Sequence, residues 1–206
     1  MARALQSSTG VMVVKGERGF TLIEMMIVVV IIGILASLAI VGYRKLITSS
    51  HVSEATNMVS NIRVAQEGYH AETQQYANIS TSVGSSGGFY PSANPVETTL
   101  TAWGAACTNC VTGMQWTMLP LHVDGPVMFG YATTAGPANS AVADATLTVS
   151  GQMLTLPSPS PTDWFIVAAT CDLDNSNGGA GPGGLTNTNV YTTSWSNQVY
   201  VSNEGD

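Results

Sequence analysis

Residues 20–41 read FTLIEMMIVVVIIGILASLAIV and contain one charged side chain, that of Glu24. From residue 25 to residue 41 the only polar interruption is Ser37. As an α-helix with about 1.5 Å rise per residue, the stretch is about 33 Å long, enough to cross the hydrocarbon core of a bilayer. Core helices of soluble proteins rarely run this far without a polar face, so the stretch predicts a membrane-spanning helix.

The helical pattern continues beyond Arg44 and Lys45. Apolar residues recur there mostly at spacings of three or four, the period of one helix face: Leu46, Ile47, Val52, Ala55, Met58, Val59, Ile62, Ala65, Tyr69 and Tyr76. No proline occurs before Phe89. We therefore predict one helix over residues 20–76, about 85 Å long, whose second part is amphipathic and needs a partner.

From residue 77 onward the composition shifts to Thr, Ser, Gly, Asn and Pro. Short runs rich in Val, Thr and aromatic residues follow, most of them separated by turn-forming residues, which is typical of β-strands. The predicted strands are 115–121, 127–132, 146–156, 164–170, 190–193 and 198–201. The fold class is therefore α+β, a long N-terminal helix packed on an antiparallel sheet. The predicted regions are 1–19, the helix over 20–76 and a β-rich head over 77–206.

Charge is scarce and unevenly placed. Only 9% of the 206 residues are charged while 45% are hydrophobic, which excludes a wholly disordered chain. All six basic residues lie within the first 63 positions: Arg3, Lys15, Arg18, Arg44, Lys45 and Arg63. Because a nucleic-acid groove needs clustered cations, nucleic acid is an improbable ligand of the head.

Two interpretations of the N-terminus compete. A secretory signal peptide would use Arg3, Lys15 and Arg18 as its basic region and would be cleaved after Ser37-Leu38-Ala39. The apolar run is longer than such signals use, and Glu24 lies near its start. Cleavage there would also remove the whole membrane segment.

The second interpretation rests on GERGFTLIEMMIVVVIIGILASLAI, residues 16–40. Gly19, Phe20, Thr21-Leu22-Ile23 and Glu24 ahead of an unbroken apolar run resemble the N-terminus of type IV prepilins and related pseudopilins. The resemblance is specific over about residues 15–45 and continues as a general pattern of long helix and β-rich head. It implies the pilin fold, a structural role and no enzymatic activity.

The resemblance also implies how the chain is processed. A prepilin peptidase cleaves between Gly19 and Phe20 and N-methylates Phe20. The product stays in the inner membrane as a single-pass protein until an assembly platform extracts it into a filament with other pilins. The filament is then an extracellular pilus or a periplasmic pseudopilus. Gly19 fits the cleavage site because its lack of a side chain leaves the scissile backbone accessible.

Glu24 has two interpretations. An acid within an apolar span is costly and usually has a partner. It could be an interfacial acid favoured by its own helix N-terminus. Alternatively, it forms a salt bridge with the Phe20 amine of a neighbouring subunit and sets the register between subunits, a role that buried charges can play.

Two glycines lie in or beside the apolar helix. Many major pilins carry a proline where this chain has Val41, so this departure weakens the assignment as a major subunit. Each glycine weakens a helix by roughly 1 kcal/mol relative to alanine. Gly33 or Gly42 could therefore supply local unwinding in a filament, whereas Gly33 could equally be a close-packing site between helices.

The cysteines are Cys107, Cys110 and Cys171. They lack zinc spacing, and an exported head favours a structural disulfide. We expect a long-range bridge from Cys107 or Cys110 to Cys171, worth about 4 kcal/mol in the entropic model. It would resemble the bridge that ties the C-terminal region of many pilins. A Cys107–Cys110 bridge is the alternative.

Residues 172–178 read DLDNSNG and place oxygen-bearing side chains at alternate positions, as at the start of a calcium loop. Asp172, Asp174 and Ser176 are the candidate ligands. The loop lacks the glycine and the final glutamate of the full motif, so an acidic turn is the simpler interpretation. No other cofactor is expected.

The predicted function is that of a structural subunit of a type IV pilus-like filament, used for motility, adhesion or DNA uptake. One alternative is a pseudopilin of a type II secretion system. The other is a membrane-anchored binding protein that does not polymerise.

Overall fold

A computed structural model describes residues 19–84, 88–104, 106–149, 152–173 and 187–202. The calcium candidates Asp174 and Ser176 and most of the predicted leader lie outside these residues. The chain divides after Gly42 into two compact units. The first contains the N-terminal part of the helix, and the second contains the rest of the helix and the head.

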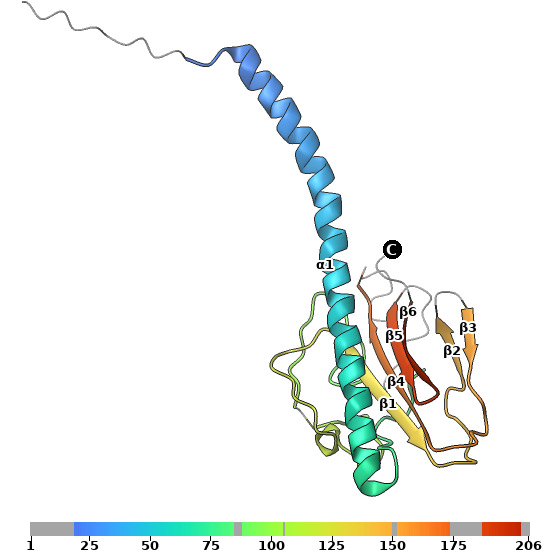
Figure 1. Cartoon of the computed structure of the whole chain (residues 1–206). Helices are drawn as coiled ribbons and strands as arrows, with labels where there is room; N and C mark the ends of the chain where they lie inside the picture. The colour runs from blue at the N-terminus through green and yellow to red at the C-terminus, as the bar shows by residue number, and fades with distance from the viewer. Residues whose placement is uncertain (1–18, 85–87, 105, 150–151, 174–186, 203–206) are drawn as a thin grey trace, which may run out of the picture. The chain divides into compact units, whose positions relative to one another are not determined.

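The dominant element is α1 (Leu22–Thr73), a single α-helix of 52 residues (Figure 1). Its bounds fall within the predicted 20–76. The helix ends where Gln74 adopts a φ of 60°, in the left-handed region, and donates its N–H to the carbonyl of His70 at 2.8 Å. In the second unit α1 is amphipathic, and its buried residues are Val52, Ala55, Met58, Val59, Ile62, Ala65 and Gln66.

The head is built on a four-stranded antiparallel sheet in the order β1-β4-β5-β6. Its strands are β1 (Gly130–Gly136), β4 (Trp164–Cys171), β5 (Thr188–Thr193) and β6 (Ser196–Ser202). A separate antiparallel pair consists of β2 (Thr146–Val149) and β3 (Gln152–Thr155). One long helix with an antiparallel sheet confirms the predicted α+β fold class.

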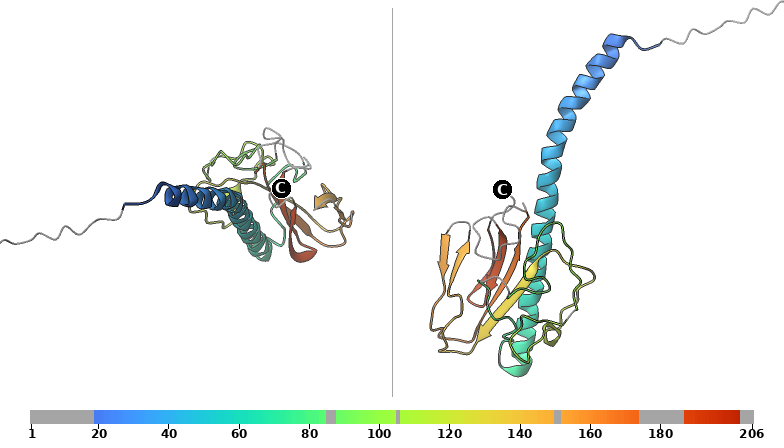
Figure 2. Two further views of the ribbon diagram at one scale, coloured as in Figure 1. Left: turned by 90° about the horizontal axis from the view of Figure 1, so that it is seen from above. Right: turned by 180° about the vertical axis from the view of Figure 1, so that it is seen from behind.

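The two inner strands of the sheet, β4 and β5, are buried on both faces. The alternation of side chains along β4 sends Phe165, Val167 and Ala169 into one cluster with the buried stripe of α1. The intervening Ile166 and Ala168 enter a second cluster. The second cluster includes Leu147 of β2, and Figure 2 shows the β2–β3 pair and α1 on opposite sides of the sheet. This double burial explains why every residue of β4 is buried.

Irregular segments cover the outer edge of β1. Ser80 donates its N–H to the carbonyl of Thr133 at 2.8 Å, and Tyr90 and Tyr131 exchange two backbone hydrogen bonds. These bonds satisfy groups that an open sheet edge would leave unpaired.

One predicted strand is wrong. Residues 115–121 contain a short 3-10 helix, η1 (Trp116–Met118), in place of a strand. Trp116 and Leu119 are buried while Met118 is exposed, so the apolar positions follow a three-residue period. The predicted run 146–156 is two strands rather than one.

Candidate functional site

The candidate assembly site is the N-terminus of α1, where Thr21 and Glu24 hydrogen-bond to each other. The Glu24 Oε2 accepts the backbone N–H of Thr21 at 2.8 Å and its hydroxyl at 2.7 Å. The Glu24 N–H in turn approaches the Thr21 hydroxyl oxygen at 3.3 Å. This reciprocal arrangement is a capping box, which satisfies backbone donors that the first helical turn leaves without partners.

The capping box adds Thr21 to the residues that sequence reasoning had selected. The sequence did carry the signal, because Thr21-Leu22-Ile23-Glu24 matches the S/T-x-x-E pattern of a capping box. In the box, the Glu24 carboxylate binds the backbone N–H of Thr21, the residue that directly follows Phe20. The structure therefore places Gly19, Phe20 and Glu24 at one exposed helix end, next to the predicted cleavage bond.

Behind the capping box the first unit is apolar and exposed all round. All residues from 22 to 42 are exposed, and among them Val41 has 71% of its surface accessible and Leu38 68%. Within the described part of the chain, α1 is the one helix long and apolar enough to cross a membrane. Because water is an unfavourable environment for such a surface, the segment requires lipid or other apolar helices around it.

Gly33 and Gly42 lie inside α1, which is continuous through both positions. Apart from the adjoining residues and nearby backbone of α1 itself, no described atom lies within 4 Å of where a Cβ would stand at either glycine. Their predicted roles as points of unwinding or close packing stay predictions, since both concern the assembled state.

The cysteine pairing differs from the expected long-range bridge. Cys107 is bonded to Cys110, three residues away, and Cys171 is a buried free thiol on β4. The expected bridge to Cys171 is therefore wrong, and the local alternative is correct. Cys110 forms an isolated β-bridge with Ser80. The Cys171 side chain instead packs in the core between α1 and the sheet. Closing only four residues, the bond contributes about 2 kcal/mol in the entropic model rather than about 4 kcal/mol.

Asp172 is the one calcium candidate that the structure describes, and it is fully buried. Its backbone N–H donates to the Pro95 carbonyl at 3.1 Å, and its carbonyl accepts the Glu97 N–H at 3.0 Å. Among the described residues no group of three or more His, Cys, Asp or Glu side chains could hold a metal ion. Calcium binding therefore stays a prediction.

Comparison with known proteins gives one family model and several relatives, each of which matches part of the chain. Residues 14–40 match the model of the prokaryotic N-terminal methylation motif. The chain is 43% identical over 68 residues to the type IV major pilin protein PilA of Myxococcus xanthus, covering 33% of this chain and 31% of that protein. It is 42% identical over 67 residues to a fimbrial protein of Pseudomonas aeruginosa, covering 32% of this chain and 44% of that protein.

A third relative is the type IV major fimbrial protein FimA of Dichelobacter nodosus, 51% identical over 51 residues, covering 25% of this chain and 33% of that protein. The chain thus spans less than half the length of each of these relatives. No solved structure matches. The methylation motif, these relatives and the long helix packed on an antiparallel sheet agree with the resemblance to type IV pilins found in the sequence.

Proposed function

We propose that this chain is a structural subunit of a type IV pilus-like filament. The observation that carries the proposal is the apolar helix of residues 22–42, exposed on every side, behind the Thr21–Glu24 capping box. Such a helix can sit in lipid before assembly and pack against copies of itself afterwards. The relatives are pilin and fimbrial proteins by name, which supports a structural rather than an enzymatic role.

Processing would act on the peptide bond between Gly19 and Phe20. Hydrolysis by a prepilin peptidase consumes one water, leaves a carboxylate on Gly19 and creates an ammonium group on Phe20. The match to the N-terminal methylation motif supports methylation of this new amine. Unlike cleavage after Ala39, cleavage here keeps the apolar helix on the mature chain.

Glu24 would act as the register element of assembly. In the single chain its carboxylate is satisfied by Thr21, which lowers the cost of carrying an acid near the end of a membrane span. In a filament the Phe20 ammonium of a neighbouring copy would become its partner. In any other axial register both charges would be buried among apolar helices without a partner, which is strongly unfavourable. The pair can therefore select one register between neighbouring copies.

The head would form the outer surface of the filament. Without residues 1–19 the chain has three basic and twelve acidic side chains, a net charge of −9. This negative charge favours solubility and disfavours contact with nucleic acid. Nothing in the chain resembles a phosphate-binding motor loop, so extraction from the membrane would depend on a separate inner-membrane platform.

Mass spectrometry of the membrane-extracted protein tests the processing step. We expect a mature chain that begins with methylated Phe20. A chain that begins at Ile40 would instead identify an ordinary signal peptide and overturn the proposal. Electron microscopy of material sheared from cells tests polymerisation, and a protein that stays membrane-anchored without filaments would support the binding-protein alternative.

A pseudopilin of a type II secretion system is the alternative within the family. Deletion of the gene separates the two roles. Loss of twitching, adhesion or DNA uptake would support the pilus, whereas loss of protein secretion would support the pseudopilus.

A further inference from the structure

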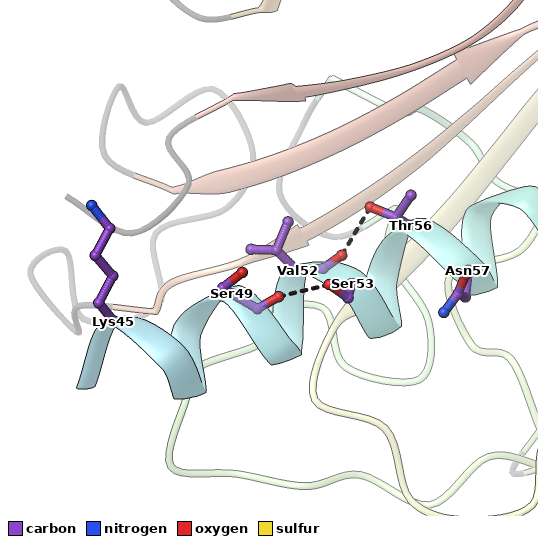
Figure 3. Close-up of a pocket in the computed structure, with 6 residues that line it drawn as sticks. All are labelled: Lys45, Ser49, Val52, Ser53, Thr56 and Asn57. Carbon is purple, nitrogen blue, oxygen red and sulfur yellow. Dashed lines mark hydrogen bonds between the residues drawn. The ribbon is translucent and has the colours of Figure 1, made fainter. Parts of the chain in front are cut away.

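Within the second unit, α1 carries a basic side chain on one flank and an acidic one on the other. Lys45 lines a shallow hollow with Ser49, Val52, Ser53, Thr56 and Asn57, and its side chain extends away from the helix (Figure 3). Ser53 and Thr56 donate their hydroxyls to helix carbonyls at 2.9 Å. Neither Arg44 nor Lys45 forms an ion pair with any described residue.

A groove of about 250 Å³ lies on the other side of Asn57. Its walls are Glu54, Asn57 and Asn61 of α1 and the segment 122–127, and Tyr131 of β1 also lines it. Tyr131 is fully buried, and its hydroxyl has no hydrogen-bond partner among the described residues. Glu54 and Tyr131 line the same groove, and burial and, secondarily, the Glu54 carboxylate raise the pKa of Tyr131.

Among the described residues that line the groove are two acids, Glu54 and Asp124, and no Lys or Arg. Glu54 is exposed and forms no ion pair within the described chain, while Asp124 contacts His122 at 2.7 Å at the rim. Beyond Arg63 the sequence contains no Lys or Arg. Arg63 itself donates to the Ser196 carbonyl at 3.0 Å. After removal of residues 1–19, the only other basic side chains are Arg44 and Lys45.

Helix geometry prevents Lys45 from reaching Glu54 of its own chain. Nine residues separate them, which corresponds to about 13.5 Å along the axis and about two and a half turns, so they lie on opposite flanks. A parallel copy displaced along the axis by about this distance presents its Lys45 at the level of Glu54.

We propose that Lys45 of one copy binds in the groove of a neighbouring copy, with Glu54 as its ion-pair partner. The inference rests on the proposed filament function and names a contact that filament formation uses. The Lys45 ammonium has three N–H donors. The groove walls offer acceptors for them in the Glu54 carboxylate and the amide oxygens of Asn57 and Asn61. Because the two halves of the contact lie on different flanks and levels of α1, the interface is head-to-tail and continues from copy to copy without closing.

Charge reversal tests the pairing in full-length protein expressed in cells that make filaments. Lys45→Glu and Glu54→Lys should each lower the yield of sheared filaments about tenfold, as expected for a lost ion pair replaced by like charges. The double variant Lys45→Glu/Glu54→Lys should restore most of the yield. Glu72→Lys is the matched control, because Glu72 is an exposed acid on the same helix outside the groove, and its yield should stay close to that of the unmodified protein.

Thiol cross-linking gives an independent measurement. Lys45→Cys combined with Glu54→Cys should yield a ladder of covalent multimers when filaments are treated with a short bismaleimide, which spans the distance that a lysine–glutamate pair bridges and a disulfide does not. Either single cysteine should yield none. Cys171 is buried and Cys107 is bonded to Cys110, so they contribute no background. Normal yield from both reversal variants and no ladder, in cells where the unmodified protein forms filaments, overturns this contact and leaves the filament function standing. Absence of filaments from the unmodified protein overturns the filament function itself.

Discussion

The carboxylate of Glu24 accepts both the backbone N–H and the hydroxyl of Thr21, so the acid of the apolar helix has a partner before any assembly occurs. The acid is therefore held at the helix end, beside the nitrogen that cleavage after Gly19 would expose. This relationship bears on the two interpretations of Glu24 left open by the sequence. The residue caps its own helix, as the first interpretation expects, and the salt bridge with a neighbouring subunit stays a prediction.

Glu24→Val tests that second role. We expect the variant to be cleaved and inserted normally, because the apolar segment is unchanged. Filament yield should fall about tenfold or more, since the Phe20 ammonium of a neighbouring copy loses its counterion. Immunoblots of membrane and sheared fractions measure both quantities. Ser37→Val is the control, because Ser37 lies in the same apolar helix outside the capping box and its variant should assemble normally. Normal filament yield from Glu24→Val would contradict the assembly role.

Gln66 links α1 to the head from a fully buried position. Its Nε2 donates to the Ala77 carbonyl at 2.8 Å and to the Thr133 hydroxyl at 2.9 Å, and its Oε1 accepts the Ala77 N–H at 2.8 Å. Gln66→Leu would leave both backbone groups of Ala77 buried without partners. The free energy of unfolding should fall by about 2–4 kcal/mol.

Urea unfolding of the detergent-solubilised chain measures this loss. Gln198→Leu is the matched control, because Gln198 is exposed on β6, and its effect should stay within about 0.5 kcal/mol. Equal effects from the two substitutions would show that the hydrogen bonds of Gln66 contribute nothing specific.

Cys171 should resist alkylation in the folded protein. The thiol is buried, and burial, followed by the nearby Asp172 carboxylate, raises its pKa to about 12. At neutral pH almost none of it is thiolate, the reactive form. Mass spectrometry after iodoacetamide treatment should find no adduct in the native protein and one after unfolding without reductant. Reduction should add two further adducts, on Cys107 and Cys110; labelling of native Cys171 would contradict its buried position.

Stability should decline at alkaline pH. Burial raises the pKa of Tyr191 to about 12, and burial together with Glu67 raises that of Tyr76 to about 12. Their ordinary values are near 10, so above that pH the unfolded chain releases protons that the folded chain retains. The contribution of these protonated groups to the free energy of unfolding is complete below about pH 9, the point at which Cys171 and then the tyrosines begin to titrate in the unfolded chain. It is lost as the pH rises toward about 12, where the same groups titrate in the folded chain.

Thermal unfolding followed by circular dichroism across this range measures the decline, and tyrosinate absorbance follows the tyrosines directly. Tyr191→Phe should make the decline shallower. A melting temperature that stays constant up to pH 12 would contradict the burial of these groups.

Calcium binding at Asp172 is testable by calorimetric titration of the purified protein. If Asp172, Asp174 and Ser176 form a site, calcium should bind and raise the melting temperature, and Asp174→Asn should weaken both effects. Asp124→Asn is the control, since Asp124 is an exposed acid elsewhere in the head. Titration that detects no heat of binding would remove calcium from the description of this protein.

The sequence by itself determined the elements that depend on neighbouring residues. In an apolar environment residues 25–41 must form a helix, because only a helix satisfies their backbone N–H and C=O groups within the segment. The spacing of three or four from Val52 to Ala65 indicates which face of α1 is buried. Strands β4 and β5 were predicted almost at their observed bounds, because their Val, Thr and aromatic residues are flanked by turn formers. The pattern Thr21-x-x-Glu24 likewise describes a contact within one helical turn.

Tertiary structure alone decided which distant segments meet. Cysteine spacing could not show that Cys107 pairs locally while Cys171 is enclosed between α1 and the sheet. Nor could the run 115–121 show that Trp116 and Leu119 would enter the core through a 3-10 turn. The groove beside Glu54 exists because segment 122–127 lies against α1 above Tyr131. Such contacts depend on packing between residues far apart in the chain, and local periodicity carries no information about that packing.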